Sequence, residues 1–380
     1  MTTPFRQFVL KIHSRCNLAC DYCYVYEMAD QGWRHQPHLM SDATVTAALD
    51  GIAEHARAHG LGAVRLILHG GEPLLAGPAY IERLATRARQ ALAPATVHLA
   101  VQTNGTLLDE PMLTALSRHA IQVGVSLDGD RAATDRHRRY RGGAGSYDAV
   151  VRGLWRLGTN HHDIYAGLLC VVNLDNDPVR TYESLLEHQP PMIDFLLPHG
   201  TWSAPPPSRP PDASAPYAAW LLRVFTRWAS GSSRPTIRMF DSIVSLLLGG
   251  PANTAVLGLA PADTLVIQTD GAIAQVDSLS AAYDGAMETG LRVDRDSLDA
   301  ALSHPLTVER QGELSALSPV CQACEIVAVC GGGFYPHRYR AGTGFRNPSV
   351  YCPDLLTLIT SIRAYVTAEL TRLDRHRLDV

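Results

Sequence analysis

The chain has no large excess of charge of either sign and no long hydrophobic run. It carries 33 Lys and Arg residues against 37 Asp and Glu, which gives a formal net charge of -4. This balance excludes a general attraction to nucleic acid or anionic lipid, so no nucleic-acid partner is expected. No apolar stretch is long enough to span a bilayer, and no signal peptide opens the chain. We therefore expect a cytoplasmic protein with no membrane association.

The chain does have enough apolar sequence for a large core, and its cysteines are unusually placed. Its 380 residues are 46% apolar, which allows one main domain and a smaller appendage. Seven of the 8 cysteines stand in two tight groups, so metal or iron-sulfur ligation is favoured over disulfides. Cys170 stands alone in the apolar run AGLLCVVN, and we expect it to be a buried core thiol.

The N-terminal half alternates β-rich runs with amphipathic stretches, the pattern of β-α units around a parallel sheet. Helices are predicted over 42–59, with Ser41 as N-cap, and over 147–157, with Ser146 as N-cap. Together the units predict an α/β fold, a partial (β/α)6 barrel, with a C-terminal iron-sulfur domain behind it. The predicted strands are 8–13, 64–69, 97–102, 122–127, 165–172 and 193–197.

The composition changes after residue 197, where a proline-rich stretch forbids both helices and central strands. We therefore place a domain boundary near Ser208. The barrel would comprise residues 1–207, and a helical linker region 208–256 would hold helices over 217–228 and 239–248. A third region, 257–380, begins with Asp270-Gly271 between apolar runs, which predicts a hairpin, and ends in an amphipathic helix that opens at Pro353.

The first cysteine group is Cys16, Cys20 and Cys23, directly after the first predicted strand. Chemistry in a β-α barrel gathers at that end of the strands. Three thiolates leave one iron of a 4Fe-4S cluster open for a ligand. A structural zinc site needs a fourth protein ligand, for which His13 is the nearest candidate. The spacing alone leaves both interpretations open.

The CxxxCxxC spacing with Tyr22 inside it, and Gly70-Gly71-Glu72-Pro73 after the second predicted strand, resemble the signatures of the radical S-adenosylmethionine (SAM) superfamily. The resemblance implies that the cluster cleaves SAM to a hydrogen-abstracting 5′-deoxyadenosyl radical. An electron donor such as flavodoxin or ferredoxin would be its partner. Glycines let backbone approach a ligand closely, and the Glu72 carboxylate would hold the SAM amino group.

Further positions at predicted strand ends match the superfamily in their order along the chain. By resemblance, Asn104 and Asp128 offer polar groups at the catalytic rim, and Ser126 contacts the SAM ribose region. The segment from Asp135 to Arg138 resembles a D-x-x-R motif whose arginine pairs with the SAM carboxylate, a task that suits a guanidinium fork. The competing interpretation of this basic run is a solvated or phosphate-binding surface.

The second cysteine group would close either a zinc site or a 4Fe-4S cluster, because it offers four thiolates. Its place behind the barrel and the hairpin resembles the SPASM extension, which carries auxiliary iron-sulfur clusters. The complete SPASM pattern has further cysteines where this chain has Gln275, Asp277 and Phe334. The resemblance therefore implies two 4Fe-4S clusters in all, with one inner auxiliary cluster lost. The auxiliary ligands would be Cys321, Cys324, Cys330 and Cys352.

The whole chain, including QVDSL at 275–279 and CGGGFYPHRYR at 330–340, resembles the FxsB-type radical SAM/SPASM maturases, which form three-residue cyclophanes. This resemblance implies a ribosomally made precursor peptide as substrate. The product would carry a C–C crosslink between an aromatic ring carbon and the β-carbon of a residue two positions later. The alternatives are another peptide modification, such as thioether bridging or epimerisation, a radical SAM enzyme acting on tRNA or a small molecule, and a non-catalytic metal-bound module.

Four residues are candidates for proton transfer and peptide binding. Asp277 and His337 are placed to take the proton that leaves when the ring regains aromaticity, although His337 fits a structural role equally well. His199 and Trp202 follow the sixth predicted strand, where barrels place binding residues. Trp202 would form an apolar wall for the substrate and His199 a polar anchor, or both would pack the proline-rich segment against the barrel.

Overall fold

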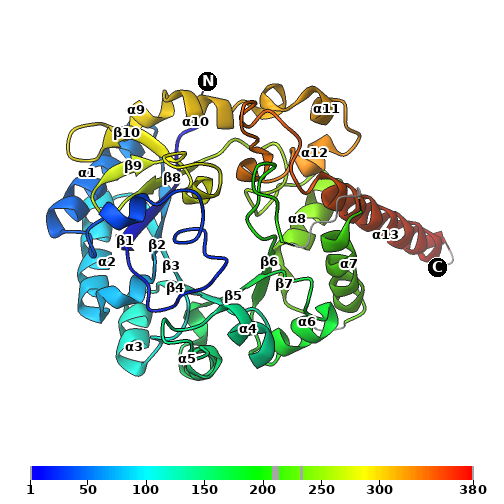
Figure 1. The fold of residues 1–380 in the computed structure, drawn as a ribbon, viewed down its shortest axis with the longest axis horizontal. Coiled ribbons are helices and arrows are strands. Elements are labelled where there is room, and N and C mark those ends of the chain that lie inside the picture. The colour runs from blue at the N-terminus through cyan, green and yellow to red at the C-terminus, as the bar shows by residue number, and fades with distance from the viewer. Residues whose placement is uncertain (1, 208–213, 232–233, 379–380) are drawn as a thin grey trace.

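The computed structural model describes residues 2–207, 214–231 and 234–378, with side chains through residue 375. Within these residues one sheet has the strand order β10-β9-β8-β1-β2-β3-β4-β5-β6-β7. Figure 1 shows this sheet curving around the inside of a ring, with helices outside it. The strands are β1 Gln7–His13, β2 Ala63–Gly70, β3 Thr96–Thr103, β4 Gln122–Ser126, β5 Tyr165–Val171, β6 Met192–Leu196, β7 Thr236–Ile237, β8 Thr264–Ile267, β9 Ala272–Ala274 and β10 Glu288–Arg292.

Strands β1 to β6 are parallel neighbours in chain order, which confirms the predicted β/α alternation. Every predicted strand agrees with the observed one to within one residue at each end. The alternation is readable because strands buried on both faces are continuous apolar runs, whereas the covering helices are amphipathic. Those helices are α1 Asp42–Ala58, α2 Pro78–Leu92, α3 Glu110–Arg118, α4 Arg131–His137, α5 Tyr147–Asn160 and α6 Pro178–Leu186.

The two predicted helix caps have different outcomes. The Ser41 hydroxyl accepts a backbone N–H of the first turn of α1 at 3.0 Å, as predicted. The prediction that Ser146 caps α5 is wrong, because its hydroxyl donates to the Arg138 carbonyl at 2.7 Å. The Asp135 carboxylate instead accepts the Tyr147 N–H at 2.9 Å, from a segment twelve positions upstream. A cap supplied by a distant residue leaves no local signal.

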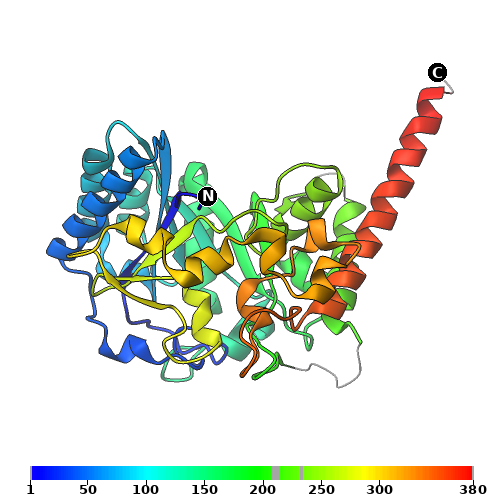
Figure 2. The same ribbon diagram turned by 90° about the horizontal axis from the view of Figure 1, so that it is seen from above.

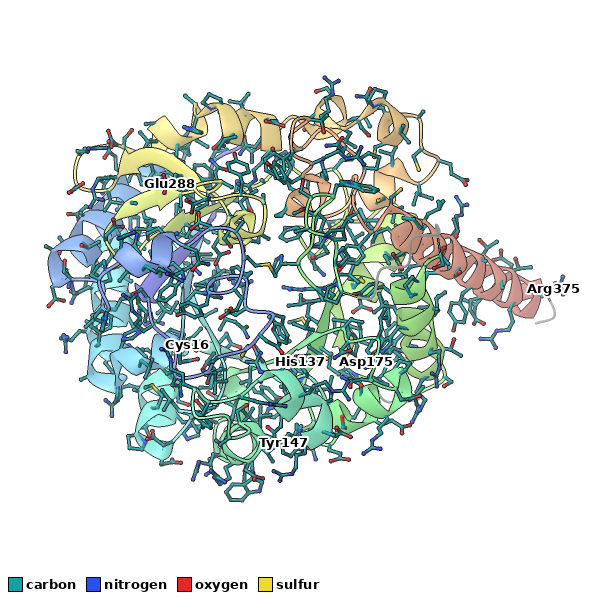
Figure 3. All side chains as sticks on the ribbon, in the orientation of Figure 1. Cys16, His137, Tyr147, Asp175, Glu288 and Arg375 are labelled. Atoms are coloured by element: carbon teal, nitrogen blue, oxygen red, sulfur yellow. The ribbon has the colours of Figure 1, made fainter. Side chains whose placement is uncertain are left out.

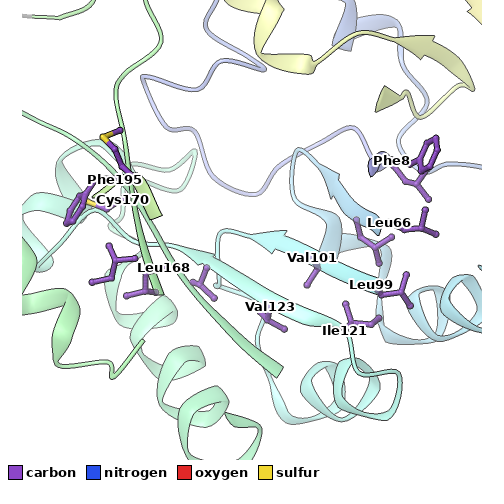
Figure 4. Packing of buried hydrophobic residues seen from close by; sticks show 14 of the residues in the cluster. Phe8, Leu66, Leu99, Val101, Ile121, Val123, Leu168, Cys170 and Phe195 are labelled. Atoms are coloured by element: carbon purple, nitrogen blue, oxygen red, sulfur yellow. The ribbon is translucent and has the colours of Figure 1, made fainter. Parts of the chain in front are cut away.

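The barrel core lies between the sheet and the helices. The register pairs Phe8 with Leu66, Leu66 with Leu99, and Cys170 with Phe195. All of these side chains are buried, and Figure 4 shows them pointing from the strands into one packed layer. Burial of this kind stabilises the fold by about 25 cal/mol per Å² of apolar surface. Cys170 is fully enclosed in this layer, which confirms that it is a core thiol.

The sheet continues past the barrel strands. Strand β7 pairs with β6, and β8 pairs with β1 in parallel before turning back into β9. The turn at Asp270-Gly271 confirms the predicted hairpin, and Gly271 has the positive φ of +93° that such turns need. The predicted limits at residues 207 and 257 therefore do not coincide with a break in the sheet. Ser208 lies outside the described residues, and the domain boundaries stay a prediction.

The chain after β6 adds further helices outside the ring (Figure 1). Figure 2 shows α13 projecting away from the body of the molecule. Cys352 and Pro353 begin α13, as the sequence predicts. Among the helices of the described ranges, none combines the length and the apolar character that crossing a bilayer requires. The bounds are α7 Pro216–Ala229, α8 Arg238–Leu247, α9 Leu298–Leu302, α10 Pro305–Arg310, α11 Pro319–Gln322, α12 Val327–Cys330 and α13 Cys352–Leu378.

Candidate iron-sulfur and SAM site

The first three cysteines lie on the loop that leaves β1, at the carboxyl end of the parallel strands. Figure 3 shows Cys16 toward the inside of the ring. Burial and the nearby charge of Cys23 raise the pKa of Cys16 to about 12 and that of Cys20 to about 11. Thiols that perturb one another in this way lie close together. A bound metal cluster would favour the thiolate form of all three.

His13, the candidate fourth zinc ligand, has its Nδ1 engaged with the backbone of the cysteine loop. Its Nδ1 lies 3.0 Å from the Arg15 carbonyl and accepts the Arg15 N–H at 3.2 Å, so it is turned toward the chain's own backbone. Cys16 instead receives the Leu18 N–H at 3.4 Å and the Asn104 side-chain amide at 3.6 Å. Three thiols with amide donors to sulfur fit a 4Fe-4S cluster with one open iron.

Gly70 and Gly71 dock the cysteine loop onto the end of β2. The Gly71 N–H donates to the His13 carbonyl at 2.8 Å. A Cβ on Gly70 would lie 2.1 Å from that same carbonyl oxygen, and one on Gly71 would lie 1.9 Å from the Tyr26 hydroxyl. The sequence predicts that these glycines let the backbone approach a ligand. The structure shows that they let it approach the cysteine loop. A side chain at either position would collide with residues of that loop.

Glu72 is fully buried beneath this loop. Its Oε1 accepts the Thr103 hydroxyl at 2.8 Å and the Leu74 N–H at 2.9 Å, while Oε2 accepts the Asn104 N–H at 2.8 Å. A carboxylate offers about four acceptor positions, so Oε2 keeps room for one more donor. Burial raises the pKa of Glu72, although the three donors oppose that shift. An ammonium group fits this carboxylate, and the SAM-binding role stays a prediction.

Arg138, Tyr22 and Asp128 form a second polar chain at the cysteine loop. The Arg138 guanidinium donates to the Tyr22 hydroxyl at 2.8 Å, and that hydroxyl donates to Asp128 in a short hydrogen bond. The other Asp128 oxygen accepts the Val171 N–H at 3.0 Å. Within the described residues the buried Arg138 Nε has no hydrogen-bond partner. An unpaired guanidinium N–H here suits a carboxylate ligand, as predicted for SAM.

The other rim residues lie along the same edge of the sheet. Ser126 ends β4 and accepts the Gln102 side-chain amide at 3.0 Å from β3. Asn104 follows β3 and reaches the cysteine loop as described above. Arg136 and Arg139 are exposed, so the solvated-surface interpretation fits them, whereas Arg138 between them in the chain is buried.

The structure brings Asp277 to the cysteine loop through partners that sequence reasoning missed. Asp277 Oδ2 lies 2.5 Å from Lys11 Nζ, accepts the Tyr24 hydroxyl at 2.7 Å and lies 4.0 Å from His69 Nδ1. Burial acts to raise the pKa of Asp277, but the Lys11 ammonium, His69 and the Tyr24 hydrogen bond together outweigh it and hold that pKa well below its usual range. The sequence does contain a signal for this pair. Lys11 lies inside the apolar strand FVLKIH, and a buried charge there needs a buried partner.

His199 and His337 extend this group toward the C-terminal region. The His199 ring centroid lies 4.9 Å from that of Tyr24 and 5.9 Å from that of His337. Burial lowers the pKa of His199 to about 4 and holds that of His337 well below its usual range. In the described part of the chain, His199 Nδ1 and His337 Nε2 are buried without a hydrogen-bond partner. His199 therefore faces the Asp277 group, and His337 lies behind it.

Trp202 lies at the junction between barrel and C-terminal region. Its indole N–H donates to the Pro348 carbonyl at 2.7 Å, and the Arg340 guanidinium lies 4.7 Å from its ring centroid. Its backbone N–H donates to the Tyr339 carbonyl at 2.9 Å. These contacts favour the packing interpretation of Trp202 over that of a free substrate wall.

A cavity of about 280 Å³ opens beside the Asp277 group. Lys11, Tyr24, Gly71 and Asp277 line one part of it, and residues 287–292 around β10 line another. Its volume is close to the lower end of the range for small-ligand pockets. The cavity therefore joins the edge of the cysteine loop to the hairpin strands.

The four C-terminal cysteines come from the ends of short helices rather than from a strand. Cys321 lies in α11, Cys330 ends α12 and Cys352 begins α13, with Cys324 in the intervening turn. Burial raises the pKa of Cys330 to about 12, and the charges of Cys352 and Cys321 add to it. The Arg338 side chain donates to three consecutive glycine carbonyls, 331–333, at 2.6–3.1 Å. Cys321, Cys330 and Cys352 thus lie near one another, and the partly buried Arg338 holds the glycine turn that follows Cys330.

The positions without the expected inner cysteines are filled by polar side chains. Gln275 is buried, and its amide donates to the Thr307 hydroxyl at 2.7 Å. The Arg310 guanidinium donates to the Gln275 carbonyl oxygen at 2.5 Å and lies 6.0 Å from the Tyr335 ring centroid. These contacts fit the prediction that the inner auxiliary cluster is lost, which stays a prediction.

Comparison with known proteins agrees with this geometry. Residues 10–187 match the family model of the Radical SAM superfamily. A serine-type anaerobic sulfatase-maturating enzyme of Klebsiella aerogenes is 27% identical over 353 residues. That alignment covers 89% of this chain and 82% of the Klebsiella protein, so the similarity extends beyond the barrel into the C-terminal region.

Solved structures show the same fold. Native anSMEcpe with bound AdoMet and Cp18Cys peptide has a TM-score of 0.81 at 20% identity, covering 98% of this chain and 99% of that one. Streptococcus suis SuiB bound to precursor peptide SuiA has a TM-score of 0.59 at 14% identity, covering 93% and 76%. At these identities the similarity shows the fold alone. The predicted α/β radical SAM fold with its parallel sheet is confirmed.

Proposed function

We propose that this chain is a radical SAM peptide maturase that forms a cyclophane in a ribosomally made precursor peptide. The new bond would join an aromatic ring carbon to the β-carbon of a nearby residue. The observation that carries the proposal is the group of Asp277, Lys11 and Tyr24 at the edge of the cysteine loop, beside a cavity. A peptide placed there would meet both a radical source and an ionised carboxylate.

The residues at the strand ends fit the cofactors that this chemistry needs. Cys16, Cys20 and Cys23 would hold a 4Fe-4S cluster, while Glu72 and Arg138 would hold the amino and carboxylate groups of SAM. When bound, these groups supply the 5′-deoxyadenosyl radical that takes a hydrogen atom from the substrate. The four C-terminal cysteines would hold an auxiliary cluster, which supplies a one-electron acceptor.

The chain's own task is to position the peptide and to accept a proton. Forming the C–C bond removes one hydrogen from the β-carbon and one from the ring, so an electron and a proton must leave after the first hydrogen atom has been taken. Asp277 is ionised at neutral pH because Lys11 holds its pKa low. Tyr24 fixes the carboxylate orientation through its hydrogen bond. The packed rings of Tyr24, His199 and Phe334 exclude water on one side.

Oxidation of a serine or cysteine side chain in a protein substrate is a second candidate function. The Klebsiella sulfatase-maturating enzyme, similar over 89% of this chain, favours it. Such an oxidation also begins at a β-carbon and also needs a proton acceptor, so the Asp277 group would serve either reaction. A precursor peptide in the SuiB complex and a peptide in the anSMEcpe complex support a peptide substrate in both cases.

The test supplies the anaerobically reconstituted enzyme with SAM, a reductant and two peptides in parallel. One is an aromatic-rich precursor peptide encoded beside the gene, and the other is a sulfatase segment with its serine. Crosslinking removes two hydrogen atoms and forms no aldehyde, whereas serine oxidation gives an aldehyde that reacts with hydroxylamine. A crosslinked precursor supports the proposal. An aldehyde in the sulfatase segment with no change in the precursor would replace it by the second function.

The role of Asp277 can be tested in the same assay. Asp277→Asn should leave peptide-independent SAM cleavage in place and reduce product by about 10²–10⁴-fold, the usual contribution of a proton-transfer group. Asp284→Asn is the matched control, because Asp284 is exposed and accepts the Gln31 backbone N–H. Equal loss of product in both variants would remove Asp277 from the mechanism.

A further inference from the structure

Three metal-ligating side chains meet outside the cysteine sites. His55 and His59 lie one turn apart near the end of α1, and Asp299 lies in the first turn of α9. One ligand atom from each residue lies within 4.8 Å of the other two. Asp299 Oδ1 is 2.5 Å from His55 Nδ1 and 3.0 Å from His59 Nε2. The fold thus joins two imidazoles and a carboxylate from positions 244 residues apart.

The contacts of His55 place two hydrogen-bond acceptors, its Nδ1 and Asp299 Oδ1, face to face. Its Nε2 lies 3.1 Å from the Phe5 carbonyl oxygen, and since that oxygen can only accept, Nε2 must carry the proton. In the neutral ring Nδ1 then has a lone pair, and that lone pair faces the Asp299 carboxylate. Two acceptors at 2.5 Å require a cation between them or a second proton on the ring. A metal cation at this point would satisfy both acceptors.

We propose that His55, His59 and Asp299 form a site for a divalent transition metal, with Zn²⁺ as the natural occupant of two imidazoles and a carboxylate. Zinc bonds of about 2.0–2.2 Å put neighbouring ligand atoms about 3.3 Å apart in a tetrahedron. The two distances to Asp299, now 2.5 and 3.0 Å, would therefore have to lengthen by less than about 1 Å to admit the ion. Asp299 is 43% exposed and His59 27% exposed, so the carboxylate can move and water can complete the coordination.

The position of the site indicates a structural role. Phe5 precedes β1 and the cysteine loop follows it, so the site lies at the end of the barrel opposite to SAM chemistry. In β-α barrels that end serves stability rather than catalysis. Figure 1 shows α9 beside α1, with α1 in the barrel and α9 in the C-terminal region. A metal here would clamp the two parts together, independently of the proposed function.

The experiment uses untagged, cluster-reconstituted protein that has been passed over a chelating resin and dialysed against micromolar Zn²⁺. Wild-type protein should bind one zinc per chain beyond its iron, and its apparent melting temperature should rise by about 2–5 °C. His59→Gln should lose the zinc and the rise while keeping its iron. Asp299→Asn should do the same, because an amide oxygen is a poor zinc ligand.

His119→Gln is the matched control. His119 ends α3 as His59 ends α1, with nearly the same backbone angles, but its ring contacts Arg89 rather than a carboxylate. This variant should keep both the zinc and the melting rise. Iron content in each sample separates this site from the cysteines, which also bind zinc when they lose their clusters. Wild-type protein without additional zinc, or His59→Gln with as much zinc as wild type, would overturn the proposal.

Discussion

Both cysteine regions offer thiols as metal ligands, but the two sets of thiols have different surroundings. Cys16, Cys20 and Cys23 lie on one loop after a strand, next to charged groups that include Arg138 and Asp277. The C-terminal set lies at or between helix ends, and Cys330 precedes a glycine turn whose carbonyls accept hydrogen bonds from Arg338. The first region keeps unpaired donors and a neighbouring cavity, and the second offers a full set of four thiols. The first setting fits the predicted SAM site, and the second fits the predicted closed cluster.

The difference follows from where each loop starts. Parallel strands end together, so a loop after β1 meets the ends of β2, β3 and β4 and collects their polar residues. Helix ends converge only through packing. The C-terminal cysteines are therefore gathered by neighbouring helices and by backbone carbonyls, with no sheet edge to supply other chemistry.

The sharpest contrast comes from removing one thiol from each region. Cys23→Ala should lower SAM cleavage by at least about 10³-fold, because two thiols cannot hold the open-site cluster. Cys324→Ala should lose the auxiliary iron but keep peptide-independent SAM cleavage. The measurement is 5′-deoxyadenosine release beside iron content. Wild-type SAM cleavage in Cys23→Ala would remove the distinction between the two regions.

A second comparison uses two glycines at opposite ends of β2. Gly71→Ala places its Cβ 1.9 Å from the Tyr26 hydroxyl, whereas a Cβ at Gly62 meets nothing within 4 Å. Pushing the cysteine loop away costs about 1–3 kcal/mol, which corresponds to a loss of about 10–100-fold in SAM cleavage. Gly62→Ala should match wild type, and iron content should fall in Gly71→Ala alone. Similar iron content in both variants would mean that the loop does not depend on this close contact.

The pH dependence of the free energy of unfolding tests whether His199 is buried beside the first cysteine region. Burial lowers the pKa of His199 to about 4, so the folded protein binds fewer protons than the unfolded chain between pH 4 and 6.5. The contribution of His199 to the free energy of unfolding is therefore full above pH 6.5. It falls by about 1.4 kcal/mol per pH unit as the pH drops toward 4. Denaturant titrations from pH 7.5 to 5.5 should show a shallower decline in His199→Gln. Identical declines would place this ring in solvent.

The smallest expected effect concerns Trp202, which joins the two regions. Trp202→Ala should lower the melting temperature by about 2–4 °C and reduce auxiliary iron, because it removes the contacts to Pro348 and Arg340. Trp202→Phe keeps the ring and loses one hydrogen bond, about 0.5–1.5 kcal/mol. A thermal melt with iron analysis and product mass spectrometry checks this. Lost product with an unchanged melt would restore the substrate-wall interpretation.

Much of the first site was readable from the chain because its residues follow strands that are themselves readable. Cys16, Glu72, Asn104 and Ser126 each stand at a predicted strand end, and parallel strands bring such ends to one edge. Lys11 and Tyr24 were missed. Their partner Asp277 lies more than 250 positions away, and no local pattern links the three.

The amino-acid sequence by itself determined the superfamily signature, the β/α alternation and the two cysteine groups, because each depends on spacing along a short stretch. Only the tertiary structure decided what each polar side chain faces. It paired Asp277 with Lys11, gave the cap of α5 to Asp135 and brought Asp299 to two histidines of α1. The physical reason is that a buried polar group takes whichever partner the packed fold brings near it, and that partner is often remote in the chain.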